Sequence, residues 1–102
     1  MWQPIAAVDD LAPGECREIV LGDHVIALFN VEGEFFALDG ICPHQGGPLG
    51  KGTLRGCVVT CPWHGWQFNV RTGQHQASAA LSHPSFPTKV DGSEIMVQLP
   101  DP

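Results

Sequence analysis

Basic residues are scarce in this sequence. Its 102 residues include five Lys and Arg against eleven Asp and Glu, which gives a formal net charge of −6. Proteins that bind nucleic acid or anionic membranes carry clusters of basic residues. The composition therefore excludes both classes of partner and favours a basic protein partner.

Long apolar segments are absent as well. The longest apolar run, residues 25–29, is far shorter than the roughly 18 residues needed to cross a membrane. The N-terminal segment also lacks the pattern of a secretion signal, because its first cation is Arg17 and acidic residues 9 and 10 interrupt its apolar stretch. We therefore expect a soluble, cytoplasmic protein that does not contact membranes.

Cysteine is too sparse for a disulfide-based fold. Four cysteines in 102 residues fall below the density of small disulfide-stabilised proteins, and a cytoplasmic chain meets reducing conditions. Cysteine in such a protein more often serves metal binding or reactivity. The length predicts one domain that spans residues 1–102.

Short β-strands dominate the predicted secondary structure. Twelve Gly and nine Pro residues indicate many turns, and no window of ten or more residues shows a helical repeat. Two-residue turn signals join apolar runs in pairs, as in antiparallel hairpins. We expect an all-β domain of about eight to ten short strands, and one of the two alternating sets of side chains in 57–61 should face a core. The predicted strands cover residues 18–21, 24–31, 35–38, 56–60, 67–70, 88–90 and 94–99, with turns at 22–23, 32–33 and 91–92.

Two loops interrupt the strand pattern, and each combines a cysteine with a histidine. The first, CPHQGGPLG, contains Cys42 and His44, and the second, CPWHGW, contains Cys61 and His64. Thiolate and imidazole are common ligands of zinc and iron. The prolines fix the backbone within each loop, and the glycines permit close approach to a bulky group. Together the loops predict a metal site made of these four side chains.

Two kinds of metal centre fit this donor set. A single Zn²⁺ bound by two Cys and two His would be tetrahedral and would stabilise a small domain. Zinc sites, however, usually pair Cys with Cys and His with His in each loop, whereas each loop here is mixed. Mixed loops suit a binuclear centre better. If one metal binds both thiolates and the other binds both imidazoles, each loop holds both metals.

The two loops resemble those of the Rieske proteins, in which His replaces Cys on one iron of a [2Fe-2S] cluster. The resemblance rests on the motifs CPHQGGPLG and CPWHGWQF and extends over essentially the whole chain. It implies a Rieske-like antiparallel β-sandwich with two cluster-binding loops. It also implies that Cys42 and Cys61 bind the inner iron, and that His44 and His64 bind the outer, solvent-facing iron.

The resemblance further implies a low reduction potential. With neutral imidazoles the oxidised cluster has no net charge, which makes it easier to reduce than a four-thiolate cluster. High-potential Rieske proteins add a disulfide at the positions of Gly47 and Trp63, and serine and tyrosine hydroxyls at the positions of Trp66 and Phe68. Hydrogen bonds to cluster sulfur stabilise the added electron. Their absence predicts about −150 mV, the low end of the Rieske range.

A chain of this length has no room for the mononuclear-iron domain of Rieske oxygenases, so the resemblance implies an electron carrier and not an enzyme. The chain is similar to the small ferredoxins that pass single electrons from a flavoprotein reductase to a terminal oxygenase. We expect a monomeric shuttle of this kind. The small subunits of some assimilatory nitrite reductases are also similar, which leaves a bound reductase subunit as the alternative. A structural zinc module is the third hypothesis.

The remaining cysteines and histidines do not indicate a second site. Three histidines lack a Cys or His partner nearby in the sequence, namely His24, His75 and His83. We interpret them as ordinary surface or half-buried residues. Cys16 and Cys57 are expected to be free thiols, and Cys57 to pack as a small apolar side chain. The segment 83–87 is interpreted as a proline-rich connection or, by the resemblance, as a third loop that covers the cluster.

Overall fold

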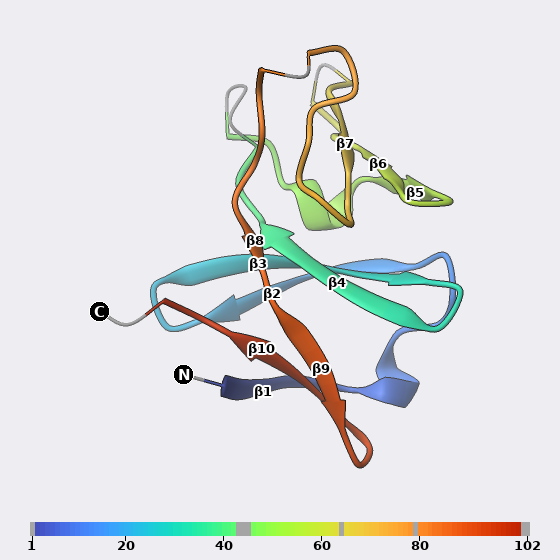
Figure 1. Cartoon of the computed structure of the whole chain (residues 1–102), viewed down its shortest axis with the longest axis vertical. Coiled ribbons are helices and arrows are strands. Elements are labelled where there is room, and N and C mark those ends of the chain that lie inside the picture. The colour runs from blue at the N-terminus through green and yellow to red at the C-terminus, as the bar shows by residue number, and fades with distance from the viewer. Residues whose placement is uncertain (1, 43–45, 64, 79, 101–102) are drawn as a thin grey trace.

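Three antiparallel sheets stack along the longest axis of the molecule, which measures 36 Å (Figure 1). The computed structural model describes residues 2–42, 46–63, 65–78 and 80–100. The lower sheet has the order β1-β10-β9, the middle sheet β2-β3-β4-β8 and the upper sheet β5-β6-β7. The strands are β1 (Trp2–Ala7), β2 (Cys16–Leu21), β3 (His24–Val31), β4 (Glu34–Asp39), β5 (Thr53–Arg55), β6 (Val58–Thr60), β7 (Gln67–Asn69), β8 (Ser85–Phe86), β9 (Thr88–Asp91) and β10 (Glu94–Gln98).

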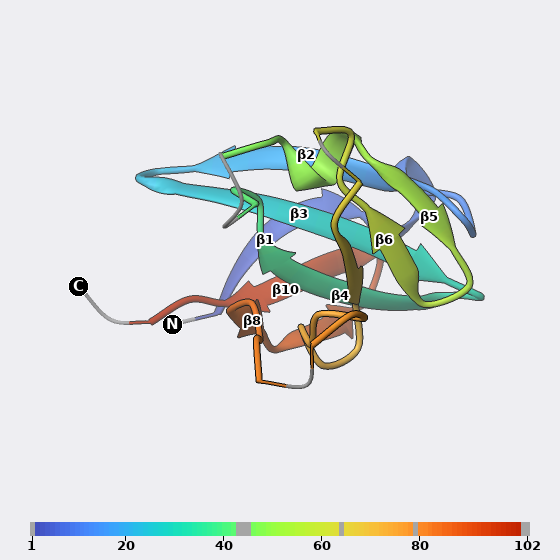
Figure 2. The ribbon, with the colours of Figure 1, turned by 90° about the horizontal axis from the view of Figure 1, so that it is seen from above.

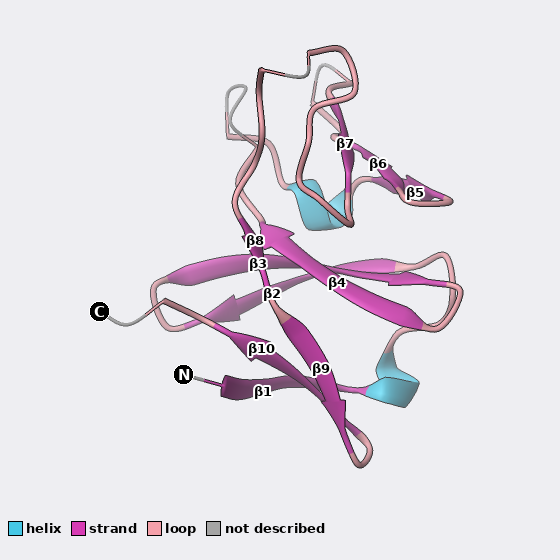
Figure 3. Ribbon diagram, in the orientation of Figure 1, coloured by secondary structure: helices cyan, strands magenta, loops and turns pink. Residues whose placement is uncertain are grey.

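Helical structure in the described part of the chain is limited to two short 3-10 helices (Figure 3). They are η1 (Val8–Asp10), after β1, and η2 (Leu49–Lys51), which leads into the upper sheet. Neither is long and apolar enough to cross a membrane. The prediction of an all-β domain is confirmed.

The central strand β3 is buried on both faces. Because successive side chains of a strand point to opposite faces, Phe29 and Val31 belong to one core and Ile26 and Leu28 to the other. The first core lies between the middle and upper sheets, and the second between the middle and lower sheets. This burial on both sides explains why the longest apolar run of the sequence falls in this strand.

The predicted hairpin turns are confirmed, with one change of position. The turn at 22–23 joins β2 to β3, and at the next turn Glu32 and Gly33 have positive φ angles of 52° and 92°, as a type I′ turn requires. The turn predicted at 91–92 lies one residue later, at 92–93. Asp91 pairs with Glu94, so Gly92 takes the first central position, where its φ of 63° suits a type II′ turn.

Three strands were not predicted, and each lacks a clear alternating pattern. Strand β1 contains a proline, and its pairing with β10 shifts in register between Pro4 and Ala6. Strand β5 is three residues long, and β8 has only two, flanked by prolines. The alternation in 57–61 is confirmed, because Val59 and Cys61 are buried in the upper core and Cys57 packs against it, whereas Val58 and Thr60 are half-buried and not part of it.

Candidate metal centre

Cys42 and Cys61, the two cysteines predicted to bind metal, are both buried in the upper core. The first follows β4, and the second lies in the loop between β6 and β7. Each is only 1% exposed. The Cys42 N–H donates to the Gly47 carbonyl at 2.8 Å, and the Cys61 N–H donates to the Trp66 carbonyl at 2.8 Å. These backbone bonds close each loop around its cysteine.

The two loops meet at Gly47. A Cβ atom at this buried glycine would lie 2.7 Å from Cys61 Sγ, so no other residue type leaves the same space beside that sulfur. Because the Gly47 carbonyl also binds the Cys42 amide, one residue connects both cysteines. The same Cβ would lie 3.0 Å from Trp63 Cβ. The two positions at which high-potential Rieske proteins carry a disulfide therefore lie against each other here.

His44 and His64, the other two predicted ligands, lie outside the described residues. Within the described ranges, no group of three or more His, Cys, Asp and Glu side chains is placed to hold a metal ion. The two described donors nevertheless fit an iron-sulfur centre. A thiolate buried this deeply would be an uncompensated charge in an apolar core, and a bound metal cation removes that cost. Because Gly47 has no side chain to collide with Cys61 Sγ, the first loop can lie directly against this sulfur.

The other two cysteines are free thiols, as predicted. Cys16 Sγ donates to the Gly52 carbonyl at 3.2 Å. Burial raises the pKa of the Cys16 thiol, and the neighbouring Glu15 carboxylate adds to this effect. Cys57 packs against the upper core as a partly buried apolar side chain. A thiol whose pKa is raised is a poor metal ligand at neutral pH, so Cys16 does not compete with the loop cysteines.

The interpretation of His75 and His83 as surface or half-buried residues was wrong. They are 9% and 6% exposed, and they lie at the two ends of a third loop, residues 74–83, between β7 and β8. The His75 ring stacks edge-on against Trp66 at 4.6 Å and Phe68 at 5.2 Å, measured between ring centroids. The His83 ring lies 5.4 Å from Phe68. These imidazoles attach the third loop to the end of the second.

Hydrogen bonds fix both imidazoles. The Ala77 N–H donates to His75 Nδ1 at 3.0 Å, so the proton of a neutral ring sits on Nε2, which is buried and has no hydrogen-bond partner among the described residues. His83 Nε2 lies 2.7 Å from the Asp39 carbonyl oxygen. Sequence patterns could not reveal the ring contacts, because Trp66 and Phe68 come from a different segment than the two histidines. Just beyond His83, the predicted connection 83–87 contains the short strand β8.

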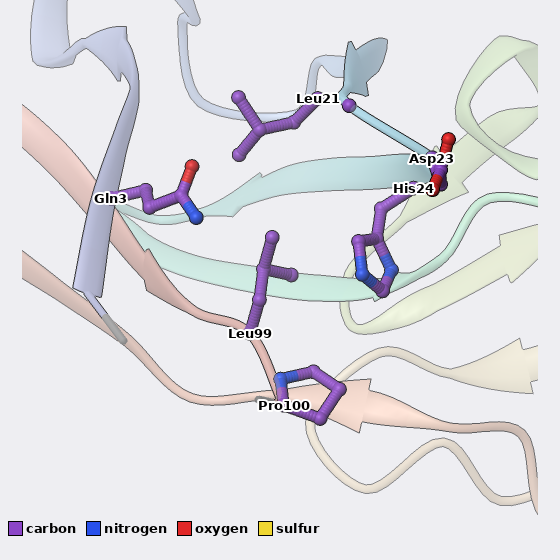
Figure 4. A pocket seen from close by; sticks show the side chains of 7 residues that line it. Gln3, Leu21, Asp23, His24, Leu99 and Pro100 are labelled. Carbon is purple, nitrogen blue, oxygen red and sulfur yellow. The ribbon is translucent and has the colours of Figure 1, made fainter. Parts of the chain in front are cut away.

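A shallow pocket of about 380 Å³ lies elsewhere on the molecule (Figure 4). It is formed by β1, the turn between β2 and β3, and the segment after β10, and its lining includes no residue of the cysteine loops. His24, the third unassigned histidine, lines it beside Asp23. The pocket is thus separate from the candidate metal centre. Its lining residues are Gln3, Leu21, Gly22, Asp23, His24, Leu99 and Pro100.

Residues 1–90 match the family model described as Rieske [2Fe-2S] domain. The ferredoxin component of the alkene monooxygenase system of Xanthobacter autotrophicus is 43% identical over 94 residues, which cover 91% of this chain and 77% of that protein. The ferredoxin component of the p-cumate 2,3-dioxygenase system of Pseudomonas putida is 40% identical over 99 residues, covering 93% of this chain and 83% of that protein.

Solved structures agree with this match. A chain in the complex of reduced oxygenase and oxidized ferredoxin of carbazole 1,9a-dioxygenase is similar, with a TM-score of 0.85 and 34% identity over 94% of this chain and 91% of that chain. The ferredoxin of carbazole 1,9a-dioxygenase from Nocardioides aromaticivorans has a TM-score of 0.87 and 25% identity, over 95% of this chain and 96% of that one. This chain belongs to the Rieske [2Fe-2S] domain family, and it is an electron-transfer protein whose cofactor is a [2Fe-2S] cluster.

Proposed function

We propose that this chain is a monomeric, cytoplasmic electron carrier that takes single electrons from a flavoprotein reductase and passes them to a terminal oxygenase. The proposal includes one Rieske domain over residues 1–102. The observation that carries it is the pair of buried thiols that meet at Gly47, at one end of a chain similar to ferredoxin components of oxygenase systems. These relatives favour a shuttle over a bound subunit of a nitrite reductase.

The proposed ligands are Cys42 and Cys61 on one iron, and His44 and His64 on the other. The bound cluster supplies one-electron oxidation and reduction. The chain holds the two sulfur ligands in a core that excludes water, and backbone hydrogen bonds fix both loops. Rigid placement of ligands reduces the rearrangement that accompanies a change in charge. Because imidazoles replace two thiolates, the site carries less negative charge than a four-cysteine site.

The surroundings of the sulfur ligands predict a low potential. Phe68 is buried beside the cysteines in the upper core, and Trp66 packs against the same core, so neither position offers a hydroxyl donor. We expect a reduction potential of about −150 mV at neutral pH, because fewer hydrogen bonds stabilise the added electron. Protein-film voltammetry measures this value directly. A potential above zero would contradict the role assigned to the missing hydroxyls.

Metal analysis and turnover test the proposed function. Protein purified anaerobically should be red-brown and contain about two iron atoms and two acid-labile sulfides per chain. With the reductase and terminal oxygenase of the carbazole 1,9a-dioxygenase system and NADH, catalytic amounts of the loaded protein should support product formation. A colourless protein that contains zinc would overturn the cofactor assignment. Fully loaded protein that accepts electrons from the reductase but passes none to the oxygenase would overturn the carrier role.

A further inference from the structure

A groove runs between β4 of the middle sheet and β9 of the lower sheet. It consists of two adjoining hollows of about 510 and 350 Å³, which share Gly33, Phe35 and Val90. The larger hollow lies against the core between these two sheets. Its apolar lining residues are Val8, Leu11, Ala12, Pro13, Phe35 and Val90. No residue of the cysteine loops lines either hollow, so the groove is separate from the metal centre.

Val90 faces into this groove. It pairs across the sheet with Ile95, which is fully buried in the core below β4, so both side chains point to the inner face of the lower sheet. Val90 itself is nevertheless 51% exposed. A side chain that faces the core and is still half exposed leaves apolar surface that a side chain of another molecule can cover.

Strand β9 also directs main-chain groups to the open edge of its sheet. It is the outer strand of the lower sheet. The Gln98 N–H donates to the Pro87 carbonyl at 2.9 Å, and bonding alternates along an antiparallel pair, so the N–H and C=O groups of Thr88 and Val90 point away from β10. The edge of β4 is less accessible, because the Phe35 carbonyl accepts from Thr88 Oγ1 at 2.5 Å. An extended segment in the groove can therefore pair with β9.

Three segments meet around the groove, residues 8–17, 30–35 and 89–94. The first and third are joined by the Val8 N–H, which donates to the Ser93 carbonyl at 2.9 Å. The 3-10 helix η1 and the turn between β3 and β4 lie toward the right in both Figure 1 and Figure 2. Together the three segments contain two basic and seven acidic residues, and the acidic ones are all exposed. The acidic residues are Asp9, Asp10, Glu15, Glu32, Glu34, Asp91 and Glu94.

The nearby cations do not cancel this negative charge. Arg17 donates to a main-chain carbonyl of η1 at 2.7 Å, and the Lys89 amine lies 4.4 Å from the centre of the Trp2 ring. Since Val90 faces the groove, its neighbour Lys89 points to the other face of the sheet. Glu34 alone of the seven acidic residues has an ion-pair partner in the described part of the chain, Arg71 at 3.6 Å. The groove is therefore bordered by carboxylates without matching cations.

We propose that the groove binds an extended, positively charged segment of a protein partner. The Lys or Arg side chains of this segment face the carboxylates, and an apolar side chain enters the larger hollow beside Val90. Main-chain hydrogen bonds to the edge of β9 set the direction of the segment. Charge complementarity selects a cationic segment, in agreement with the basic partner that the net charge of −6 favours. The inference goes beyond the proposed function, because binding here does not occupy the loops that hold Cys42 and Cys61.

A peptide titration followed by NMR tests the groove. Isotope-labelled, oxidised holoprotein is mixed with a capped peptide of about eight residues that alternates Lys with Leu. The amide signals of Leu11, Gly33, Phe35 and Val90 should shift, and the Kd should rise by about tenfold or more between about 20 and 200 mM NaCl. A peptide with Ser in place of Leu should bind at least about fivefold more weakly, because no apolar side chain fills the hollow. Shifts centred on other residues, or equal binding of the two peptides, would overturn the inference.

Two variants with matched controls locate the binding. Asp9→Asn removes a carboxylate that lines the larger hollow, and Val90→Thr replaces an exposed methyl group by a hydroxyl. Each should raise the Kd of the Lys-Leu peptide by about threefold or more. Asp23→Asn and Val20→Thr make the same changes at exposed positions outside the groove and should stay within about twofold. Unchanged binding to both groove variants would count decisively against this site.

A second copy of this chain is the other occupant that an open strand edge allows. Sedimentation velocity of the concentrated protein without peptide should therefore show a monomer. A dimer whose formation shifts the same amide signals would overturn the inference, because the groove would then bind another copy of the chain. The titration needs neither reductase nor oxygenase, so its failure leaves the carrier role intact. Failed turnover with intact peptide binding would count against the carrier role alone.

Discussion

The Cys42→Ser and Cys61→Ser variants are expected to lose nearly all of their iron and acid-labile sulfide. A serine hydroxyl has almost the size of a thiol but does not ionise near neutral pH and is a poor ligand for iron-sulfur centres. Both positions are 1% exposed, so no other side chain can replace the lost sulfur from solvent. Iron and sulfide assays on anaerobically purified protein, with the visible spectrum, measure the loss.

The matched controls are Cys16→Ser and Cys57→Ser. Both cysteines are half-buried and free, and neither belongs to the two loops. A serine at position 16 can still donate to the Gly52 carbonyl that Cys16 contacts. These variants should retain the iron content of the original chain. Loss of iron from Cys16→Ser, or its retention in Cys61→Ser, would contradict the ligand assignment.

The Gly73→Ala variant should lose more than about 3 kcal/mol of unfolding free energy. Gly73 has a φ of 80°, and a Cβ atom there would collide with the backbone carbonyl of His83. The Gly73 carbonyl accepts a hydrogen bond from the His83 N–H at 2.7 Å, so the two backbone segments at the base of the third loop are in direct contact. Backbone atoms cannot move aside as a flexible side chain can. Urea unfolding followed by circular dichroism measures the change.

Gly56→Ala isolates the contribution of the backbone conformation. Gly56, in the turn between β5 and β6, also has a positive φ, 57°, but it is exposed, and a Cβ atom added there would meet no other atom within 4 Å. Its replacement should cost about 1 kcal/mol, the usual penalty for a left-handed alanine. The difference between the two losses of unfolding free energy measures the cost of the clash with the His83 carbonyl. Equal losses would show that the approach is unimportant.

Local patterns in the sequence were sufficient for the central part of the fold. The middle hairpins were predicted because each pairs an apolar run with a turn that contains glycine, and β3 stands out because it is buried on both faces. Strands β1 and β8 were missed because their pairing depends on distant partners. In β1 a register shift after Pro4 breaks the alternation, and β8 is too short to show any.

The candidate site, like the fold, could be predicted from the sequence only in part. The cysteines and histidines of the two loops are adjacent in the sequence, so their residue types and spacing were enough to predict a metal centre. The approach of Gly47 to Cys61 and the burial of His75 result from contacts between separate segments. No periodicity within one segment encodes such contacts.

The burial of β3 on both faces has a consequence for how the molecule opens. Leu28 and Phe29 are consecutive residues, yet they pack into different cores. Opening of the upper core, where the sulfur ligands lie, would loosen the same strand that supports the lower core. Unfolding of the upper core alone is therefore disfavoured, and the two cores should open as one cooperative unit. Such cooperativity limits access of oxygen and competing metals to the sulfur ligands between encounters with redox partners.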